Sequence, residues 1–201
     1  MSTLSFLTYL FKKSIESGIF PQKWKQSNVV PVFKQGDTQI VSNYRPISLL
    51  CNLSKVFEKI VYNCLYDYCI ENNLLSVRKS GFKKGDGTVN RLIYITNNIY
   101  KALDAGEEVA MVFLDISKAF DKVWIQGLLH KLEKFGVSGN LLEWLRSYLT
   151  SRSQKTVLSG NCLNIKNNKG PSIDPSGTPA FISLIFEHLP DKTVFWLRPV
   201  K

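Results

Sequence analysis

The sequence has few cysteines and no long apolar run. Its four cysteines, Cys51, Cys64, Cys69 and Cys162, follow no zinc-site spacing, and nothing suggests secretion, so we expect reduced, buried thiols. No apolar run approaches the roughly 20 residues that cross a membrane. Residues 6–11 are mostly apolar, but two lysines follow and no small-residue cleavage site appears, so we expect no signal peptide. These absences predict a soluble intracellular protein of the nucleus or cytoplasm, with no membrane partner.

Acidic residues are also in deficit. The chain has 26 Lys and Arg against 16 Asp and Glu, which gives a formal net charge of +10 and a pI of about 9.4. This charge favours a polyanionic partner such as nucleic acid, although a basic solvated surface explains it as well. A hydrophobic fraction of 44% supports a real core in the 201 residues, as one domain or two small ones.

The most informative stretch is residues 109–121, VAMVFLDISKAFD. Residues 109–114 form a short apolar run rich in β-branched and aromatic residues, which predicts a strand buried on both faces. The run stops at Asp115, just before a helical pattern, where α/β proteins commonly place metal ligands and catalytic groups. The residues alone leave open the alternative that Asp115 caps the following helix.

The string F-L-D-I-S-K-A-F-D-K-V resembles motif A of reverse transcriptases from non-LTR retrotransposons, in particular the jockey-like group. The resemblance implies that Asp115 binds the catalytic Mg²⁺ ions, which prefer oxygen ligands. It also implies that Ile116 lies beside the incoming deoxynucleoside triphosphate (dNTP) and that Phe120 is a gate against ribonucleotides. Asp121 matches the family pattern too, in what we expect to be a structural role.

Two further basic residues lie in a string that resembles the fingers region of these enzymes, from F-P-Q-K-W-K to N-Y-R-P-I-S-L-L. In that family, basic residues here contact the triphosphate of the incoming nucleotide and the template strand. Arg45 is the favoured candidate, because a guanidinium can hold a phosphate through two parallel hydrogen bonds and Pro46 restricts its backbone. Lys34 is the second candidate. Without the resemblance, both are better explained as solvated surface cations.

Residues 78–88, RKSGFKKGDGT, are glycine-rich and basic but lack the Gly-Lys-Ser/Thr ending of a Walker loop. By themselves they indicate either a flexible basic turn or a loop whose lysines follow a nucleic-acid backbone. The resemblance, to a template-contacting segment G-F-R-K-G-R-S-T, favours binding by Lys83 and Lys84 with Phe82 available for stacking. Asp86 replaces an arginine of that segment, and Gly87 replaces a serine, which predicts weakened binding.

Apolar spacing outlines the remaining elements. It predicts strands over residues 27–33 and from residue 152, and helices over residues 4–15, 52–72, 88–101, 128–135 and 140–150. The helix over residues 52–72 is expected to be well buried, with Glu58 and Lys59 off its apolar face. His130 has no suggested Ser or Cys partner, which indicates a surface histidine.

The close resemblance covers residues 4–159 and implies an α+β fold. We expect the fingers and a partial palm of a right-hand polymerase, with helices packed on a short mixed sheet, over residues 1–160. Residues 161–201 are expected to be a divergent tail. The family's G-V-P-Q-G-S motif and its F/Y-x-D-D turn, which carries further metal-binding carboxylates, are missing, and no Asp-Asp pair occurs in the sequence.

The sequence of the tail, residues 161–201, favours a frameshift as its origin. Codons for the glycine-rich motif, read in a shifted frame, match the tail in place at Gly170, Pro171, Ser172, Gly177 and Thr178. The sequence therefore predicts an RNA-directed DNA polymerase by family, using Mg²⁺, an RNA template, a DNA primer and dNTPs, in a truncated chain that is inactive by itself. A non-catalytic nucleic-acid-binding remnant and a product without function remain open, and nothing indicates an oligomer.

Overall fold

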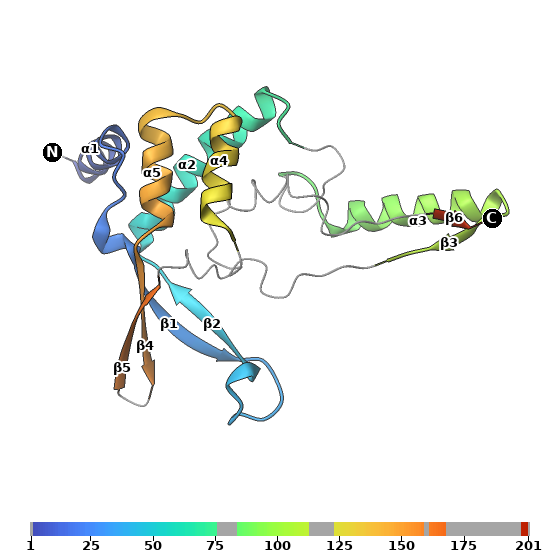
Figure 1. Cartoon of the computed structure of the whole chain (residues 1–201), viewed down its shortest axis with the longest axis horizontal. Coiled ribbons are helices and arrows are strands. Elements are labelled where there is room, and N and C mark those ends of the chain that lie inside the picture. The colour runs from blue at the N-terminus through green and yellow to red at the C-terminus, as the bar shows by residue number, and fades with distance from the viewer. Residues whose placement is uncertain (1, 76–83, 113–122, 159–160, 168–197, 201) are drawn as a thin grey trace. The chain divides into compact units, whose positions relative to one another are not determined.

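The computed structural model describes residues 2–75, 84–112, 123–158, 161–167 and 198–200. The chain divides into two compact units, Met1–Cys64 with Lys118–Pro179 and Leu65–Ser117 with Ala180–Lys201. Figure 1 labels the helices and strands in chain order. The expected combination of helices with a small mixed sheet is confirmed.

The first unit contains most of the helices and the larger sheet, with the helices gathered at one end of the strands in Figure 1. The helices and strands predicted within this unit are present within a few residues of their predicted bounds. The elements of this unit are α1 (Thr3–Glu16), η1 (Gln22–Lys25), β1 (Gln26–Phe33), η2 (Val41–Asn43), β2 (Tyr44–Leu49), the first part of α2 (Asn52–Glu71), α4 (Ile125–Lys134), α5 (Gly139–Leu149), β4 (Arg152–Leu158) and β5 (Asn161–Asn167).

The sheet has the strand order β2-β1-β4-β5. β1 is antiparallel to β2 and parallel to β4, and β4 is antiparallel to β5. Pro31 of β1 lies opposite Pro46 of β2. Proline cannot donate to a strand ladder and is confined to positions with a free side. Both prolines fit this rule, because β2 is an edge strand and β4 pairs with β1 only as far as Val29.

An aromatic cluster forms the core that joins α1, α2 and α5. Phe57 of α2 stacks on Phe11 of α1, with ring centroids 4.3 Å apart, and meets Trp144 of α5 at 4.9 Å. Phe20 meets Trp144 and Tyr148 edge to face at 5.3 and 4.9 Å. Phe57, Phe20, Trp144 and Tyr148 are all buried. Such rings contribute packing energy beyond the apolar area that they bury, so this cluster is the main stabilising element of the unit.

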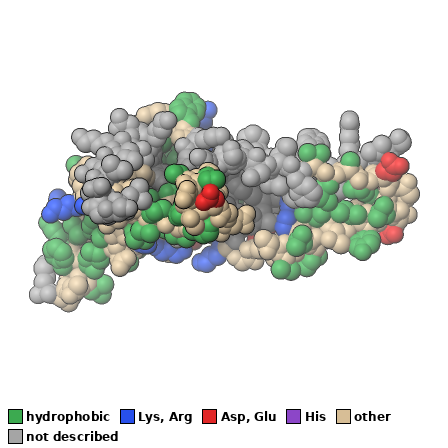
Figure 2. All heavy atoms as spheres, turned by 90° about the horizontal axis from the view of Figure 1, so that it is seen from below, with side chains coloured by type: hydrophobic (Ala, Val, Ile, Leu, Met, Phe, Trp, Pro, Cys, Tyr) green, Lys and Arg blue, Asp and Glu red, His purple; other side chains and the backbone are tan. Residues whose placement is uncertain are grey.

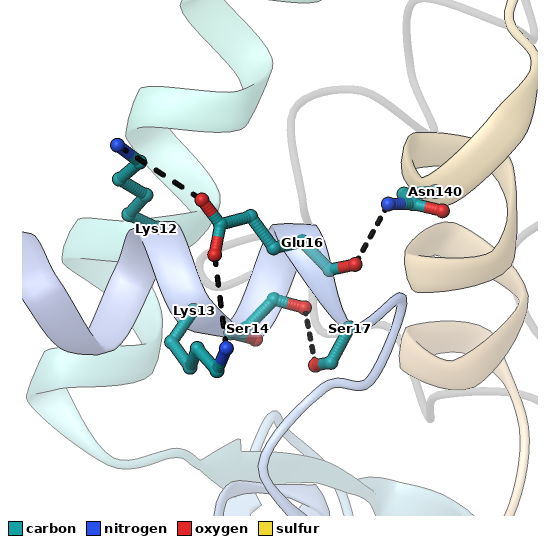
Figure 3. Close-up of polar contacts among 6 residues, drawn as sticks. All are labelled: Lys12, Lys13, Ser14, Glu16, Ser17 and Asn140. Atoms are coloured by element: carbon teal, nitrogen blue, oxygen red, sulfur yellow. Dashed lines mark hydrogen bonds and ion pairs between the residues drawn. The ribbon is translucent and has the colours of Figure 1, made fainter.

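Hydrogen bonds hold the C-terminal end of α1 against α5 (Figure 3). The Asn140 side-chain amide donates to the carbonyl oxygen of Glu16 at 2.7 Å, which satisfies a carbonyl at the helix end. The Trp144 indole N–H donates to Ser14 Oγ at 3.0 Å, and that hydroxyl donates to the carbonyl oxygen of Ile19 at 2.6 Å. Gly18, with φ of +66°, permits the turn that leads from the end of α1 to Ile19.

The second unit contains the end of α2, then α3 (Thr88–Asp104), β3 (Glu108–Ala110) and β6 (Arg198–Val200), with β3 antiparallel to β6. Large hydrophobic side chains are exposed along α3, as the green surface at the right of Figure 2 shows. They are Val89, Leu92, Ile93, Tyr94, Tyr100 and Leu103. The predicted helix is therefore present, and Ile95 in its apolar stripe is buried, but most of its large apolar side chains are exposed.

The prediction of a strand buried on both faces over residues 109–114 is wrong for its described part. Glu108 and Ala110 are exposed, and Val112 is 49% exposed. β3 has one short neighbour among the described residues, β6, and a two-stranded ribbon covers neither of its faces. Residues 113–114 lie outside the described ranges.

Burial also corrects the predictions for α2 and for the cysteines. Leu53, Val56 and Ile60 of α2 are exposed, because the core contacts one side of the helix only. Cys51, Cys64 and Cys69 are free thiols, as predicted, but Cys51 and Cys64 are exposed, and Cys69 is buried. Within the described ranges, none of the helices has the length and apolar character needed to cross a membrane.

The predicted domain boundary at residue 160 falls in the link between β4 and β5, at residues 159–160, which are not described. β5 pairs with β4 along its whole length, so the sheet of the first unit continues beyond that boundary. The division into residues 1–160 and 161–201 stays a prediction. The proposed frameshift at residues 170–179 lies outside the described residues.

Candidate nucleic-acid interface

The β1–β2 hairpin carries the two basic residues of the predicted nucleotide site. Its connecting loop is held by side-chain hydrogen bonds: Asp37 Oδ1 accepts from the Gln39 N–H at 2.8 Å, and the Asn43 amide donates to the carbonyl oxygen of Asp37 at 2.8 Å. Gly36 has φ of +94°, and a Cβ there would approach Asn43 Nδ2 to 2.9 Å. The loop therefore has a defined local structure, which orients the strand ends beside it.

The strand register places Arg45 on the exposed face of the sheet. Arg45 lies opposite Val32, and both are exposed, whereas Ser48 and Val29 pair on the buried face. Successive side chains of a strand point to opposite faces. We call the exposed side the outer face; on β1 and β2 it is formed by Asn28, Val30, Val32, Arg45, Ile47 and Leu49.

Lys34 continues the same face. It follows the last residue of β1, and its N–H donates to the carbonyl oxygen of Asn43 at 2.8 Å, which extends the ladder by one step. Alternation then places Lys34 on the side of Val32 and Arg45. Lys34 and Arg45 are both exposed, and neither has an ion-pair partner in the part of the chain that the structure describes. The structure thus brings together the two residues predicted to contact the triphosphate.

The glycine-rich basic loop is described only from Lys84 onward. Lys84 is exposed, and its backbone N–H donates to the Tyr66 hydroxyl at 3.1 Å. Asp86 Oδ1 accepts from the Gly87 N–H at 2.8 Å and from the Asn90 amide at 3.1 Å, so this carboxylate is engaged at the start of α3. Phe82 and Lys83 lie outside the described residues.

The residues of the predicted motif A are not described either. Asp115, Ile116, Phe120 and Asp121 all fall within residues 113–122. Among the residues that are described, no group of three or more His, Cys, Asp or Glu side chains could hold a metal ion. Asp115, with its carboxylate, has the donor chemistry that Mg²⁺ prefers. The predicted Mg²⁺ site therefore depends on the sequence alone.

His130 is exposed as predicted, with Nδ1 3.8 Å from Glu133 Oε2.

The sequence prediction missed a buried polar cluster between α2, α5 and β4. Glu58, placed off the apolar face by the sequence pattern, is buried and accepts a hydrogen bond of 2.6 Å from Ser54 Oγ. Arg152 is also buried; its Nη1 donates to the carbonyl oxygen of Tyr148 at 2.9 Å, and its guanidinium lies 4.7 Å from the centre of the Tyr148 ring. The spacing of Ser54, Glu58 and Val61 matches the buried side of α2 and could have revealed that Glu58 is buried, although not which residues surround it.

Burial is the largest cause of the pKa shifts in this cluster. Burial raises the pKa of Glu58, an effect that its contacts with Ser54, Arg152 and Tyr148 only partly oppose. Burial, together with the nearby Glu58 carboxylate, raises the pKa of Tyr148 well above its usual range. Burial and then the proximity of Arg152 lower the pKa of Lys25, whose Nζ donates to Ser147 Oγ at 3.2 Å. The cluster lies on the buried side of the sheet, so its protonation is expected to affect the stability of the first unit.

Comparison with known proteins connects these features to a family. The profile of the family described as "Reverse transcriptase (RNA-dependent DNA polymerase)" matches residues 32–179. The chain is 34% identical over 159 residues to the probable RNA-directed DNA polymerase from transposon BS of Drosophila melanogaster. This alignment covers 76% of this chain and 18% of that protein.

Two further relatives also carry the name of an RNA-directed DNA polymerase from a mobile element. The RNA-directed DNA polymerase from mobile element jockey of Drosophila melanogaster is 32% identical over 164 residues, 81% of this chain and 18% of its own length. The probable RNA-directed DNA polymerase from transposon X-element of the same organism is 32% identical over 148 residues, 73% of this chain and 16% of its own length. The chain thus spans less than a fifth of these relatives. It belongs to the reverse transcriptase family, in the branch carried by non-LTR retrotransposons.

Proposed function

We propose that this chain is the nucleotide- and template-binding part of an RNA-directed DNA polymerase, comprising the fingers and the start of the palm. The observation that carries the proposal is the outer face of the β1–β2 hairpin, where Lys34 and Arg45 are exposed beside each other. A guanidinium and an ammonium on one face suit the triphosphate of an incoming dNTP. The family membership supplies the reaction: copying of an RNA template by extension of a DNA primer.

The carboxylate of Asp115 would hold Mg²⁺, with Ile116 and Phe120 beside the nucleotide. Bound there, Mg²⁺ would supply the positive charge that activates a primer hydroxyl and stabilises a leaving pyrophosphate. The 201 residues contain no Asp-Asp pair, so the further carboxylates of the family's metal site must come from outside this sequence. We therefore propose that the chain alone binds nucleic acid but does not extend a primer.

We assign a separate contact with the template strand to Lys83 and Lys84 of the second unit, with Phe82 as a stacking surface. The exposed side chain of Lys84 and the net charge of +10 support this assignment. The Asp86 carboxylate is bonded to Gly87 and Asn90. These bonds hold it at the start of α3, where its negative charge would weaken the contact of the two lysines with phosphate.

A combined binding and extension assay tests the proposal. The chain is mixed with a labelled DNA primer annealed to an RNA template, with dNTPs and Mg²⁺, beside an Asp115→Ala variant. We expect both proteins to retain the primer–template and neither to lengthen the primer. Failure of both to bind would contradict the nucleic-acid function. Extension that Asp115→Ala abolishes would show a complete metal site and contradict the proposed inactivity.

A further inference from the structure

The outer face does not end at the hairpin. β4 runs parallel to β1 on the side away from β2, with Lys155 opposite Asn28. Residues paired across neighbouring strands point to the same face, and the burial pattern agrees, because Asn28 and Lys155 are both exposed while Val29 is buried and Thr156 half-buried. Lys155 therefore lies on the same side of the sheet as Arg45.

The charges on this face all have one sign. Its charged members among the described side chains are Lys34, Arg45 and Lys155, and Lys155 has no ion-pair partner in the described ranges. Between Arg45 and Lys155 the face carries exposed apolar side chains, with Val30, Val32 and Leu49 at 43%, 42% and 50% exposure. A face with cations at both ends and apolar groups between them complements a polyanion that also has apolar surface, such as a nucleic-acid strand with unstacked bases.

The separation distinguishes Lys155 from the nucleotide-binding pair. Asn28 lies four residues along β1 from Val32, and β4 lies two strands from β2. The usual rise and spacing of strands then put the Cα atoms of Lys155 and Arg45 roughly 16 Å apart. A strand with repeated phosphates suits that separation better than the single triphosphate that Arg45 and Lys34 flank.

We infer that Lys155 contacts a phosphate of the single-stranded RNA template, which crosses the outer face from β4 toward the β1–β2 hairpin. This inference rests on the proposed function and adds to it a template contact on β4. The template's bases and sugars lie over Val30 and Leu49, and Lys155 sets the position of its backbone.

The test measures binding of a fluorescein-labelled single-stranded uridine 12-mer by anisotropy at several salt concentrations. Lys155→Gln is compared with Lys12→Gln, a matched control that removes the same charge from α1, where the Lys12 side chain is 75% exposed. Loss of one phosphate contact should reduce the slope of log affinity against log salt by about 0.7 and weaken binding several-fold at low salt. Lys12→Gln should leave the slope unchanged. Lys155→Arg, which keeps the charge, should also keep the slope and exclude a folding defect at this position.

Each outcome separates the inference from the proposed function. If Lys155→Gln and Lys12→Gln behave alike while the unmodified chain binds RNA, the β4 contact is refuted and the proposed function stands. If the unmodified chain does not bind RNA, the proposed function itself fails. If Lys155→Gln weakens dTTP binding as much as RNA binding, Lys155 belongs to the nucleotide site and the template assignment is overturned.

Discussion

The Trp144 indole N–H of α5 donates a hydrogen bond of 3.0 Å to Ser14 Oγ of α1, which joins two helices separated by 130 positions in the sequence. Trp144 is buried, so its N–H has no access to water as an alternative acceptor. The bond therefore contributes to the stability of the first unit through the penalty that would follow its loss.

Ser14→Ala should destabilise the chain by about 1–3 kcal/mol, because it leaves a buried donor unsatisfied. Ser17→Ala is the matched control: its hydroxyl donates to the carbonyl oxygen of Ser14 at 3.1 Å near the exposed end of α1. It should change the unfolding free energy by no more than about 0.5 kcal/mol. Urea denaturation followed by tryptophan fluorescence measures both, and equal effects would contradict the role assigned to the Ser14–Trp144 bond.

Phe57→Ala should cost about 3–5 kcal/mol of unfolding free energy, because the cavity lies among the rings of Phe11 and Trp144. Phe6→Ala removes the same ring from a position that is 55% exposed and should have little effect. The two denaturation midpoints provide the comparison. A small loss for Phe57→Ala would show that the aromatic cluster is not the main core of the first unit.

Glu58→Gln should change the pH dependence of stability. Because burial raises the pKa of Glu58, the folded chain holds this proton more tightly than the unfolded chain does. Stability contributed by protonated Glu58 is therefore lost as the pH rises from the ordinary glutamate value of 4.5 through the raised folded value. Glutamine mimics the protonated side chain, so the variant should be more stable than the unmodified chain at neutral pH.

The measurement is the difference in unfolding free energy between Glu58→Gln and the unmodified chain from pH 4 to pH 8. This difference should grow with pH and then level off. Glu71→Gln, an exposed position on the same helix, is the control. A difference for Glu58→Gln that does not vary with pH would refute the linkage.

Arg45→Gln should weaken binding of dTTP by about tenfold or more, the expected loss for charge-assisted hydrogen bonds to a phosphate. Arg45→Lys should recover part of the affinity, because lysine keeps the charge but not the paired donors. Nucleotide titration monitored by NMR at the backbone amides of positions 32 and 45 measures the affinity of both variants. Unchanged affinity in Arg45→Gln would remove Arg45 from the nucleotide site.

The sequence predicted the helices and strand β1 well because those elements follow local rules, whereas strand β2, which completes the hairpin, was not predicted. Regular apolar spacing marked α1 and α5, and alternating residues marked β1. Burial was predicted less well. The apolar run at residues 109–114 indicated a covered strand, but covering needs partners, and β3 has only β6 beside it in the described chain.

The buried cluster around Glu58 was not predicted, for a different reason. A charged residue beside an apolar stripe normally points to solvent, and no local pattern announces that Tyr148 and Arg152 approach it from other elements. For the candidate site, the motif residues were found by resemblance. That Lys155 shares the outer face with Arg45 depends on the parallel pairing of β1 with β4, which sequence spacing does not reveal.

The most direct test of the account is the salt dependence of RNA binding by the unmodified chain. Phosphate contacts by Lys83, Lys84 and Lys155 predict that log affinity falls linearly with log salt, with a slope of about −2. A slope near this value would support an RNA-binding part of a reverse transcriptase. Undetectable binding, or an affinity that does not depend on salt, would contradict the central claim that this chain binds nucleic-acid phosphates.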